Sequence, residues 1–362
     1  MRGLPSTAMA DPTVSVPVSP APAPVARPGA LVLGQSGFED LLVRELTDAG
    51  GKVLGKGGGW VHVEGIDPAA EWCFAHTVLR DPVEVTGDSV NQLAGRLADW
   101  FLAVIRTERI EGVWPSLFLA AAGLDGLGRR VDGVEKAFAE IIRKRMSRVA
   151  KLAVAEAPRG VAVATGLYVV FVDFKRALVS RTAAFGGQRR MADDDQAPSR
   201  SYLKVEEAYT VLGREPAPGE TVVDLGAAPG GWSYSAAKRG AHVIAIDNGP
   251  LKGGALDHPL IEHRREDAFG FRPAGGAVVD WMFCDLVEDP HHVVRNLITP
   301  WLENRWCRHF VVILKFGRVD AIALLREVTA PDSPFVKHTT SLRVRHLYHD
   351  REEFTLVGEV RG

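Results

Sequence analysis

The stretch VVDLGAAPGGWS, residues 222–233, decides the fold of the second half of this chain. An apolar strand-like run, TVVDL, leads into glycines at 226, 230 and 231, and a helix-like run follows. A strand that turns through glycines into a helix is the context of a nucleotide-cofactor loop. The glycines let a ligand approach the backbone, and amides at the start of a helix can hold a carboxylate or a phosphate.

The spacing in this loop indicates which kind of ligand it binds. Gly226 is followed by Ala227, Ala228 and Pro229, so the GxGxxG pattern is absent, and the proline lacks an amide that a pyrophosphate would need. Asp247 ends the next strand-like run, where a carboxylate can bind both ribose hydroxyls of an adenosine. The loop therefore favours a ligand with an adenosine and a carboxylate over a dinucleotide. The structural alternative is a glycine turn that only packs a helix on a strand.

The residues after this loop alternate between strand-like and helix-like runs. Near-continuous Val and Ile runs separated by helices predict a doubly wound α/β domain over 201–362, with ligands at the carboxyl ends of its strands. The last run, 341–360, predicts two strands around a turn near His349 and Asp350, which is an antiparallel hairpin at the sheet edge. The expected strands lie at 221–225, 242–246, 260–267, 277–285 and 309–315, and the expected helices at 230–240, 291–307 and 319–328.

The region 30–185 mixes short strand-like runs with amphipathic helix-like runs, and this pattern predicts a smaller α+β, ferredoxin-like arrangement. Residues 160–174 are expected to form two strands with a turn near Gly166. Residues 186–200, rich in glycine and charge, are expected to be a linker, and the Pro-rich residues 1–29 a disordered tail. The remaining expected helices lie at 38–50, 89–107 and 134–154, and the remaining strands at 60–65 and 114–122.

Composition narrows the class of protein. The chain has 362 residues, of which 46% are hydrophobic and 24% charged, and its formal net charge is −2. Its three cysteines form no CxxC pair, so neither a disulfide framework nor a metal site is expected. No apolar run is long enough to span a membrane or form a signal-peptide core, and we expect a cytoplasmic protein.

A basic segment lies between Arg129 and Lys151. A solvated helix face is the ordinary interpretation of such a run, because charged runs usually serve solubility. The alternative is a helix that contacts phosphates, if the other half of the chain acts on nucleic acid. The candidate RNA-binding residues are Arg143, Lys144, Arg145 and Arg148.

Several stretches together carry a resemblance to a known family. They are APSRSYLKVEEAY, DLGAAPGGWSYSAAKRG, AIDNGPL, EDAFGFRP, WMFCDLVEDP, NRWCRHFVVILK and LYHDREEFTLV. They resemble the RlmM-type 23S rRNA ribose 2′-O-methyltransferases of the FtsJ/RrmJ superfamily, and GFEDLLVRELTDAGG resembles the start of that family's amino-terminal region.

This resemblance implies a fold and a function. The fold is a Rossmann-like S-adenosylmethionine-dependent methyltransferase domain, preceded by a ferredoxin-like and THUMP region that binds RNA. The implied substrate is a ribose 2′-hydroxyl of a cytidine in 23S rRNA, modified before or during large-subunit assembly. No protein partner, membrane or metal is implied.

The resemblance also implies a catalytic set, Lys204, Asp285, Lys315 and Glu353. Asp285 and Lys315 end consecutive expected strands, so both should project at the edge where the cofactor loop lies. Lys315 is the expected general base and Lys204 its support, with the two carboxylates orienting the pair. Each residue alone is more simply a solvated surface group, and Glu352 is a rival to Glu353.

The expected cofactor contacts come from the loop and from later strand ends. Asp247 is assigned to the ribose, Asp267 to the adenine amino group, and Ser201, by family analogy, to the methionine end. Trp232 could equally serve core packing. The full set is Ser201, Gly226, Ala228, Pro229, Gly230, Gly231, Trp232, Asp247, Asp267 and Asp285.

Other chemistries fit these residues less well. Cytosine C5 methylation needs a cysteine nucleophile just beyond a proline, whereas Cys284 precedes Asp285, and base-amino methylation favours a [DN]PP[YFW] stretch that DLVEDP lacks. A methyltransferase of the same fold acting on another RNA or on a small molecule remains an alternative. A non-catalytic RNA-binding protein is the alternative from a different class.

Overall fold

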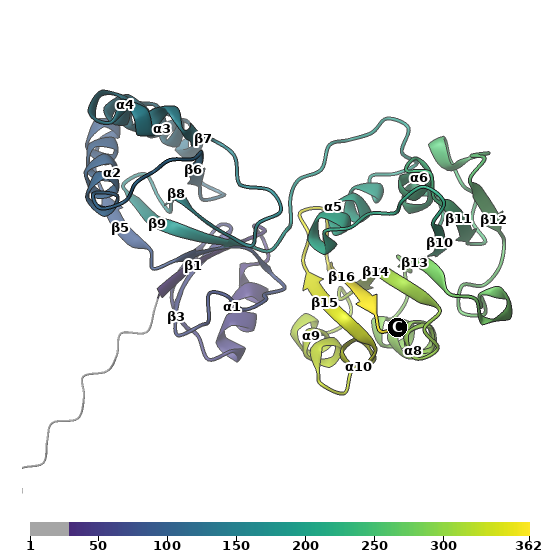
Figure 1. The fold of residues 1–362 in the computed structure, drawn as a ribbon. Coiled ribbons are helices and arrows are strands. Elements are labelled where there is room, and N and C mark those ends of the chain that lie inside the picture. Colours follow the sequence, from purple (N-terminus) through teal and green to yellow (C-terminus); the bar gives the residue numbers. More distant parts are fainter. Residues whose placement is uncertain (1–28) are drawn as a thin grey trace, which may run out of the picture.

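The chain folds into two lobes that are joined by an extended segment, as the computed structural model in Figure 1 shows. The structure describes residues 29–362. The tail expected over 1–29 therefore lies outside the described residues, except for Gly29, which begins the first strand. The expected linker, 186–200, contains no helix or strand, and the helix that follows begins at Tyr202.

The carboxyl-terminal lobe is a seven-stranded sheet with the order β12-β11-β10-β13-β14-β16-β15. The first five strands are parallel, and β16 is antiparallel to both β14 and β15, which confirms the edge hairpin. The strands are β10 (Thr221–Leu225), β11 (His242–Ile246), β12 (Ile261–Arg264), β13 (Val279–Cys284), β14 (Cys307–Lys315), β15 (Thr339–Arg345) and β16 (Glu353–Val360).

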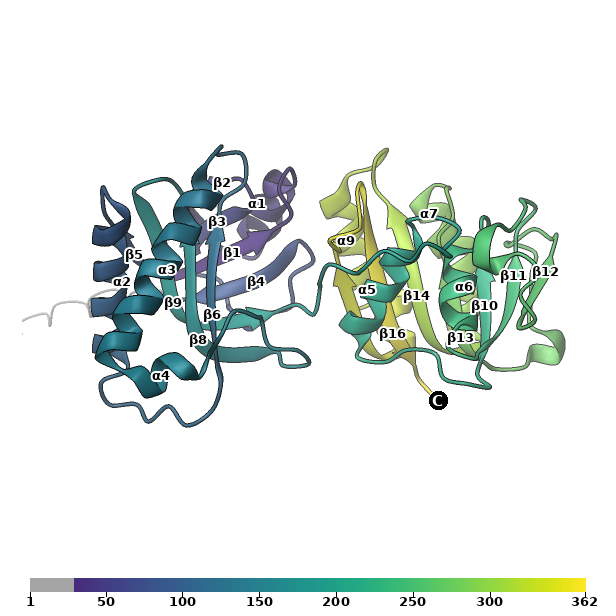
Figure 2. The same cartoon turned by 90° about the horizontal axis from the view of Figure 1, so that it is seen from above.

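Helices cover both faces of this sheet, as a doubly wound fold requires, and Figure 2 shows the sheet between them. Alternate strand residues face opposite sides: Val222 packs with α5 and α6, whereas Val223 packs with the helices that follow β13 and β14. The helices are α5 (Tyr202–Leu212), α6 (Gly231–Ala237), α7 (Pro290–Val293), α8 (Thr299–Glu303), α9 (Ala321–Thr329) and α10 (Pro334–His338), with a π-helical segment Val294–Ile298 between α7 and α8. The prediction of a Rossmann-like domain is confirmed.

The alternation of strands and helices is less regular than the sequence predicted. Only the short 3-10 segments Gly253–Ala255 and Ala274–Gly276 lie between β11 and β12 and between β12 and β13. Helix α5, by contrast, precedes the first strand and was not expected. It carries Lys204, which the sequence placed only just before a strand.

The amino-terminal lobe is a nine-stranded sheet with the order β2-β3-β1-β4-β9-β8-β6-β7, and β5 pairs with β9. Its strands are β1 (Gly29–Gly34), β2 (Lys52–Gly57), β3 (Trp60–Glu64), β4 (Ala75–Arg80), β5 (Val83–Thr86), β6 (Trp114–Ala120), β7 (Ala153–Val154), β8 (Val163–Phe171) and β9 (Arg176–Phe185). Its helices are α1 (Glu39–Asp48), α2 (Val90–Val104), α3 (Leu127–Arg145) and α4 (Ser147–Lys151).

The first four strands have a ferredoxin-like arrangement. Their order is β2-β3-β1-β4, each is antiparallel to its neighbour, and α1 connects β1 to β2. A loop over 65–74 stands where a second connecting helix would lie in a βαββαβ unit. The expected α+β class of this region is therefore confirmed, with one helix fewer than the full unit.

Two sequence predictions in this lobe are wrong in detail. Residues 160–174 do not form two strands with a turn at Gly166, because β8 runs through that glycine as one strand. A Cβ at Gly166 would lie 2.4 Å from the carbonyl oxygen of Pro115, so glycine there permits a close approach of backbone rather than a turn. The single helix expected over 134–154 is divided at Met146 into α3 and α4, and it begins earlier, at Leu127.

The two lobes contact each other through apolar and polar groups. Phe74 of the amino-terminal lobe packs edge-on against Phe316, and both belong to one buried cluster that includes residues of both lobes. The carboxylate of Asp320 accepts from Arg44 at 2.7 Å, and the His76 ring lies 2.9 Å from the carbonyl oxygen of His346. Within 29–362, no helix is both long and apolar enough to cross a membrane.

Candidate active site

The loop at 226–230 joins β10 to α6 at the carboxyl edge of the sheet. Gly226 has φ 84° and Gly230 has φ 104°, a backbone region that favours glycine. A Cβ at Gly230 would lie 2.5 Å from the Cβ of Ala255, so glycine is required there by space as well as by conformation. These glycines hold the loop close to the ends of the neighbouring strands.

Asp247 follows β11 and lies directly beside this loop. One of its carboxylate oxygens accepts from the amide of Ala228 at 2.9 Å, and the other accepts from the amide of Gly249 at 2.7 Å. A carboxylate has about four lone-pair sites, so two remain to accept hydroxyl protons. The residues present therefore fit a ligand with two ribose hydroxyls.

The other expected cofactor residues lie around the same edge. Asp267 is exposed beyond the end of β12, where one oxygen accepts from the amide of Phe269 at 3.1 Å. Ser201 lies before α5 and donates its hydroxyl proton to Asp285 at 3.0 Å. Pro229 and Gly231 lie in the loop and at the first position of α6.

The Trp232 side chain does not line this edge. It is buried among core residues, packs edge-on against Phe283 and donates its indole proton to the carbonyl of Ser201 at 3.0 Å. The core-packing interpretation is therefore correct for the indole. Only the backbone of Trp232 can contact a cofactor at this edge.

The four expected catalytic side chains come together in two ion pairs. The Lys204 ammonium lies 2.6 Å from Glu353, and the Lys315 ammonium lies 2.6 Å from Asp285. Lys315 also donates to the carbonyl of Leu286 at 3.1 Å. Four elements supply these groups: Lys204 lies in the first turn of α5, Asp285 directly follows β13, Lys315 ends β14, and Glu353 begins β16.

Electrostatics link the two pairs into one cluster. Burial disfavours the charge of Lys204, but the carboxylates of Asp285 and Glu353 outweigh burial and raise the pKa of Lys204. Burial also disfavours the charge of Asp285, yet Lys204 and Lys315 hold the pKa of its carboxyl below the usual value. Lys204 is thus a cation that lies between two carboxylates.

The structure distinguishes Glu353 from its rival. Glu353 is buried and pairs with Lys204, whereas Glu352 is exposed and lies against Gly317. Strand alternation places the two carboxylates on opposite faces, as the sequence implied. Glu353 therefore belongs to the cluster, and Glu352 does not.

Two buried carboxyl groups near this cluster were missed by the sequence analysis. Asp350 lies in the turn before β16, accepts from the amide of Leu347 at 2.9 Å, and has its pKa raised well above the usual value by burial. Glu207, on α5, is also fully buried. Turn and helix residues of this kind are usually exposed, so only the structure reveals them.

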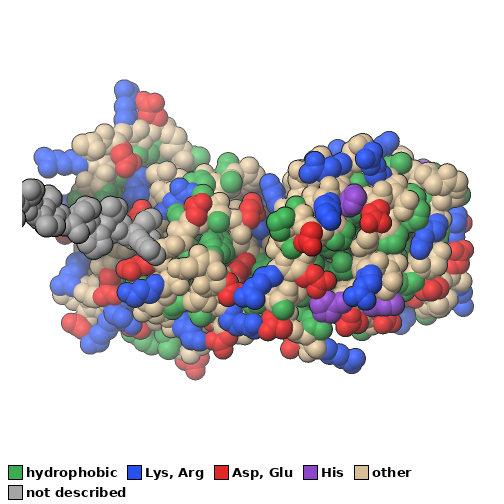
Figure 3. Space-filling model, turned by 90° about the horizontal axis from the view of Figure 1, so that it is seen from below, with side chains coloured by type: hydrophobic (Ala, Val, Ile, Leu, Met, Phe, Trp, Pro, Cys, Tyr) green, Lys and Arg blue, Asp and Glu red, His purple; other side chains and the backbone are tan. Residues whose placement is uncertain are grey.

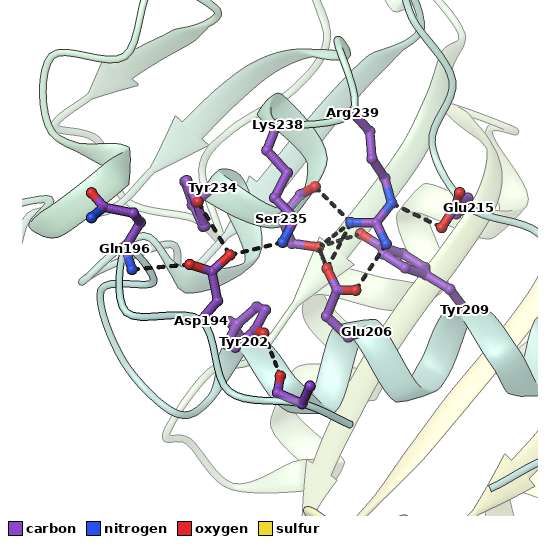
Figure 4. A network of polar contacts seen from close by, with 11 residues as sticks. Asp194, Gln196, Tyr202, Glu206, Tyr209, Glu215, Tyr234, Ser235, Lys238 and Arg239 are labelled. Carbon is purple, nitrogen blue, oxygen red and sulfur yellow. Dashed lines mark hydrogen bonds and ion pairs between the residues drawn. The ribbon is translucent and has the colours of Figure 1, made fainter. Parts of the chain in front are cut away.

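A separate polar network fixes α5 against α6 and the linker (Figure 4). Glu206 receives a two-pronged ion pair from Arg239, with distances of 2.6 and 2.8 Å, and the Ser235 hydroxyl proton at 2.6 Å. Asp194 of the linker accepts from Lys238 at 2.9 Å. The Glu206 contacts stabilise the packing of α5 against α6.

The basic segment of the amino-terminal lobe lies at the end of α3 and in α4. Arg143, Lys144 and Arg148 are exposed and form no ion pair with any residue in the described part of the chain, whereas Arg145 pairs with Asp99 at 2.6 Å. The segment borders a hollow of about 360 Å³ whose lining includes Phe138. On the face shown in Figure 3, basic and acidic side chains alternate over both lobes without forming a continuous basic stripe.

Comparison with known proteins places this site in a class. Residues 197–303 match the family model described as FtsJ-like methyltransferase, so the carboxyl-terminal lobe is a Rossmann-like methyltransferase domain. S-adenosylmethionine, which carries an adenosine and a carboxylate, is the cofactor of this class, and the site around Asp247 suits it.

Relatives then identify the family. A "Ribosomal RNA large subunit methyltransferase M" from Thauera aminoaromatica is 32% identical over 368 residues, covering 90% of this chain and 94% of the relative. Another from Laribacter hongkongensis is 37% identical over 246 residues, covering 63% of this chain and 66% of the relative, slightly less than two thirds. The chain belongs to the ribosomal RNA large subunit methyltransferase M family. Among solved structures, TrmN from Thermus thermophilus is 14% identical, covers 92% of this chain and 100% of its own, and has a TM-score of 0.35.

Proposed function

We propose that this protein transfers a methyl group from S-adenosylmethionine to a ribose 2′-hydroxyl of large-subunit rRNA, on a cytidine of 23S rRNA. The observation that carries the proposal is the pair of linked lysine–carboxylate contacts, Lys204 with Glu353 and Lys315 with Asp285, at the edge that holds the cofactor loop. No cysteine takes part in this cluster: Cys284 is fully buried, and burial raises the pKa of its thiol to about 12. A cytosine C5 mechanism, which needs a thiolate, is therefore disfavoured.

The reaction needs little from the protein beyond orientation and a proton acceptor. The bound cofactor supplies a methyl group on a positively charged sulfur. The chain must hold a weakly nucleophilic hydroxyl in line with that methyl group and receive its proton. Two lysines at one sheet edge can supply both actions.

We assign the proton acceptor to Lys315 and the orienting cation to Lys204. The raised pKa of Lys204 keeps its ammonium charged, so it donates hydrogen bonds but accepts no proton at neutral pH. Lys315 accepts the hydroxyl proton in its neutral form, which is the only form of a lysine able to do so.

The two carboxylates orient the lysines. Asp285 binds the Lys315 ammonium and the Ser201 hydroxyl with different oxygens, which fixes Lys315 relative to the start of α5. Glu353, at the start of β16, forms the ion pair that holds Lys204 of α5. We assign the ribose of the cofactor to Asp247, its adenine to Asp267, and its methionine end to the loop and to Ser201.

We assign RNA binding to residues 30–185, as a ferredoxin-like and THUMP region that works with the methyltransferase domain at 201–362. The exposed cations Arg143, Lys144 and Arg148, which form no ion pair with residues 29–362, support this assignment, because phosphate contacts supply much of the affinity of proteins for RNA. The partner is large-subunit rRNA before or during its assembly.

The test is labelled methyl transfer to three substrates. The protein is incubated with methyl-labelled S-adenosylmethionine and naked 23S rRNA, assembled large subunits or tRNA, and the modified nucleotide is mapped. We expect label in 23S rRNA and much less in assembled subunits or tRNA. Label in tRNA alone, or in no RNA, would overturn the proposed substrate.

A further inference from the structure

Glu207 is a buried carboxylate that none of the steps above uses. It lies on α5 one turn after Lys204, and its solvent exposure is 0%. It forms no ion pair with any residue in 29–362, and burial raises the pKa of its carboxyl to about 7. Burying a carboxylate without an ion pair costs folding free energy, which its hydrogen bonds must offset.

The contacts of Glu207 join three segments that are far apart in sequence. One oxygen accepts from the amide of Arg189 in the linker and from the amide of Tyr348, both at 3.0 Å. The other oxygen accepts from the amide of His349 at 3.2 Å. Tyr348 and His349 lie in the turn that leads into β16 and Glu353.

Neighbouring contacts reinforce the same junction. The amide of Met191 in the linker donates to the His349 ring at 2.9 Å, and the guanidinium of Arg190 lies 5.2 Å from the centre of the Tyr348 ring. Tyr348 in turn packs on His76 of the amino-terminal lobe, with ring centres 4.1 Å apart. The turn is therefore fixed from the linker, from α5 and from the amino-terminal lobe.

We propose that Glu207 is a positioning residue for the catalytic pair of Lys204 and Glu353. Lys204 belongs to α5 and Glu353 to β16, so their contact depends on how the helix sits against the turn that precedes this strand. Glu207 is the side chain of α5 that binds the amides of that turn directly. This inference rests on the proposed function, because it assigns Glu207 a role in that reaction.

A matched control lies at the adjacent residue. Glu206 is on the same helix, is 8% exposed and is also a carboxylate, but it contacts Ser235 on α6 and Arg239 in the turn after α6 (Figure 4). Glu207→Gln and Glu206→Gln thus make the same chemical change at neighbouring buried positions. Only the first replaces an oxygen that accepts from the turn with a nitrogen that cannot.

The experiment compares the two full-length variants with the wild type on the same RNA. For Glu207→Gln we expect kcat to fall about ten- to a hundredfold, because small misplacements of catalytic groups have effects of this size. The Kd for S-adenosylmethionine and the KM for RNA should stay at wild-type values. Amide hydrogen exchange over 346–352 should become faster. For Glu206→Gln we expect a lower Tm, with kcat and this exchange unchanged.

Two results would overturn the inference: wild-type kcat in Glu207→Gln, or losses of kcat in both variants in proportion to their losses of Tm. If Glu207→Gln does not fold, Glu207→Asp keeps the charge but is too short to reach all three amides, and the same loss of kcat is expected. A wild type that methylates no RNA contradicts the proposed function instead, while the exchange measurement still tests whether Glu207 holds the turn over 346–352.

Discussion

Lys204 and Lys315 are chemically identical residues that the fold places in different surroundings. Lys204 lies between two carboxylates, whereas Lys315 pairs with one carboxylate and one carbonyl oxygen. This difference is why we assign the proton acceptor to Lys315. These surroundings could not be predicted from the sequence: the end of an expected strand placed Lys315 at the cofactor edge, and only the family resemblance brought Lys204 there.

The assignment predicts the behaviour of Lys315→Met, which keeps the length of the side chain and removes the amine. The rate of methyl transfer should fall by about 10²–10⁴-fold, the usual contribution of general acid–base catalysis. Binding of S-adenosylmethionine, measured by calorimetry, should be unchanged. Lys337→Met, at an exposed position on α10, serves as the control and should retain full activity. Full activity in Lys315→Met would exclude this lysine as the acceptor.

The buried carboxyl of Asp224 should make the free energy of unfolding depend on pH. Burial, opposed in part by the Ser233 hydroxyl at 2.6 Å, raises the pKa of Asp224 from 3.8 to about 7. The folded state therefore keeps a proton that the unfolded state has already released, and stability from this group falls as pH rises through about 7. Between pH 6 and pH 8 the loss is about 1.4 kcal/mol.

In Asp224→Asn this dependence should disappear, because an amide does not titrate and its oxygen can still accept from Ser233. Urea unfolding at pH 6 and pH 8 measures the difference in unfolding free energy between the two pH values. That difference should be smaller in the variant than in the wild type by about 1.4 kcal/mol. An equal pH dependence in both proteins would show that Asp224 is charged in the folded state.

At the scale of elements, the end of α3 and α4 form the predicted RNA contact. Reversing the charges of Arg143, Lys144 and Arg148 together should weaken RNA binding and flatten its dependence on salt. Arg145 is a suitable single control, because its ion pair with Asp99 already neutralises it and Arg145→Ala should have a smaller effect than Arg143→Ala. Filter binding from low to high salt gives the slopes. If the slope of RNA affinity against salt concentration is unchanged, this segment is a solvated helix face and does not contact RNA.

Helices and strands with a clear hydrophobic pattern could be predicted from the sequence. Features that depend on contacts between distant segments could not. The strands around the cofactor loop show continuous apolar runs, because both faces of the sheet are buried, and their ends place Asp247, Asp285 and Lys315 at one edge. The prediction of a turn at Gly166 was wrong because the sequence does not distinguish the two reasons for a glycine. Here the glycine makes room for the backbone of Pro115 on the neighbouring strand, and it does not form a turn. The contacts of Glu207 join 189, 348 and 349, and no local pattern in the sequence links such distant residues.

At the scale of the whole molecule, the two lobes share buried surface. Phe74 and Phe316 lie in one apolar cluster, and the buried Arg345 of β15 forms an ion pair with Glu71 and donates to the carbonyl of Gly186 at 3.1 Å. The methyltransferase lobe therefore uses the amino-terminal lobe to cover part of its core.

A fragment of residues 201–362 should accordingly be less stable than the full chain. Loss of residues 29–200 exposes apolar surface around Phe316 and removes the contacts of the Arg345 guanidinium with Glu71 and the carbonyl of Gly186. We expect a lower Tm by calorimetry and stronger binding of a hydrophobic dye than in the full chain. A fragment with the Tm of the full chain and no dye binding would show that the lobes are independent.

The central claim is that the methyl group goes to a ribose oxygen. The most direct measurement incubates the wild-type protein with 23S rRNA and methyl-labelled S-adenosylmethionine, digests the RNA to nucleosides and identifies the labelled product by mass spectrometry. Our account predicts label on the ribose of cytidine, as 2′-O-methylcytidine, and its loss in Lys315→Met. Label on the cytosine ring, or on the base of any other nucleoside, would contradict it.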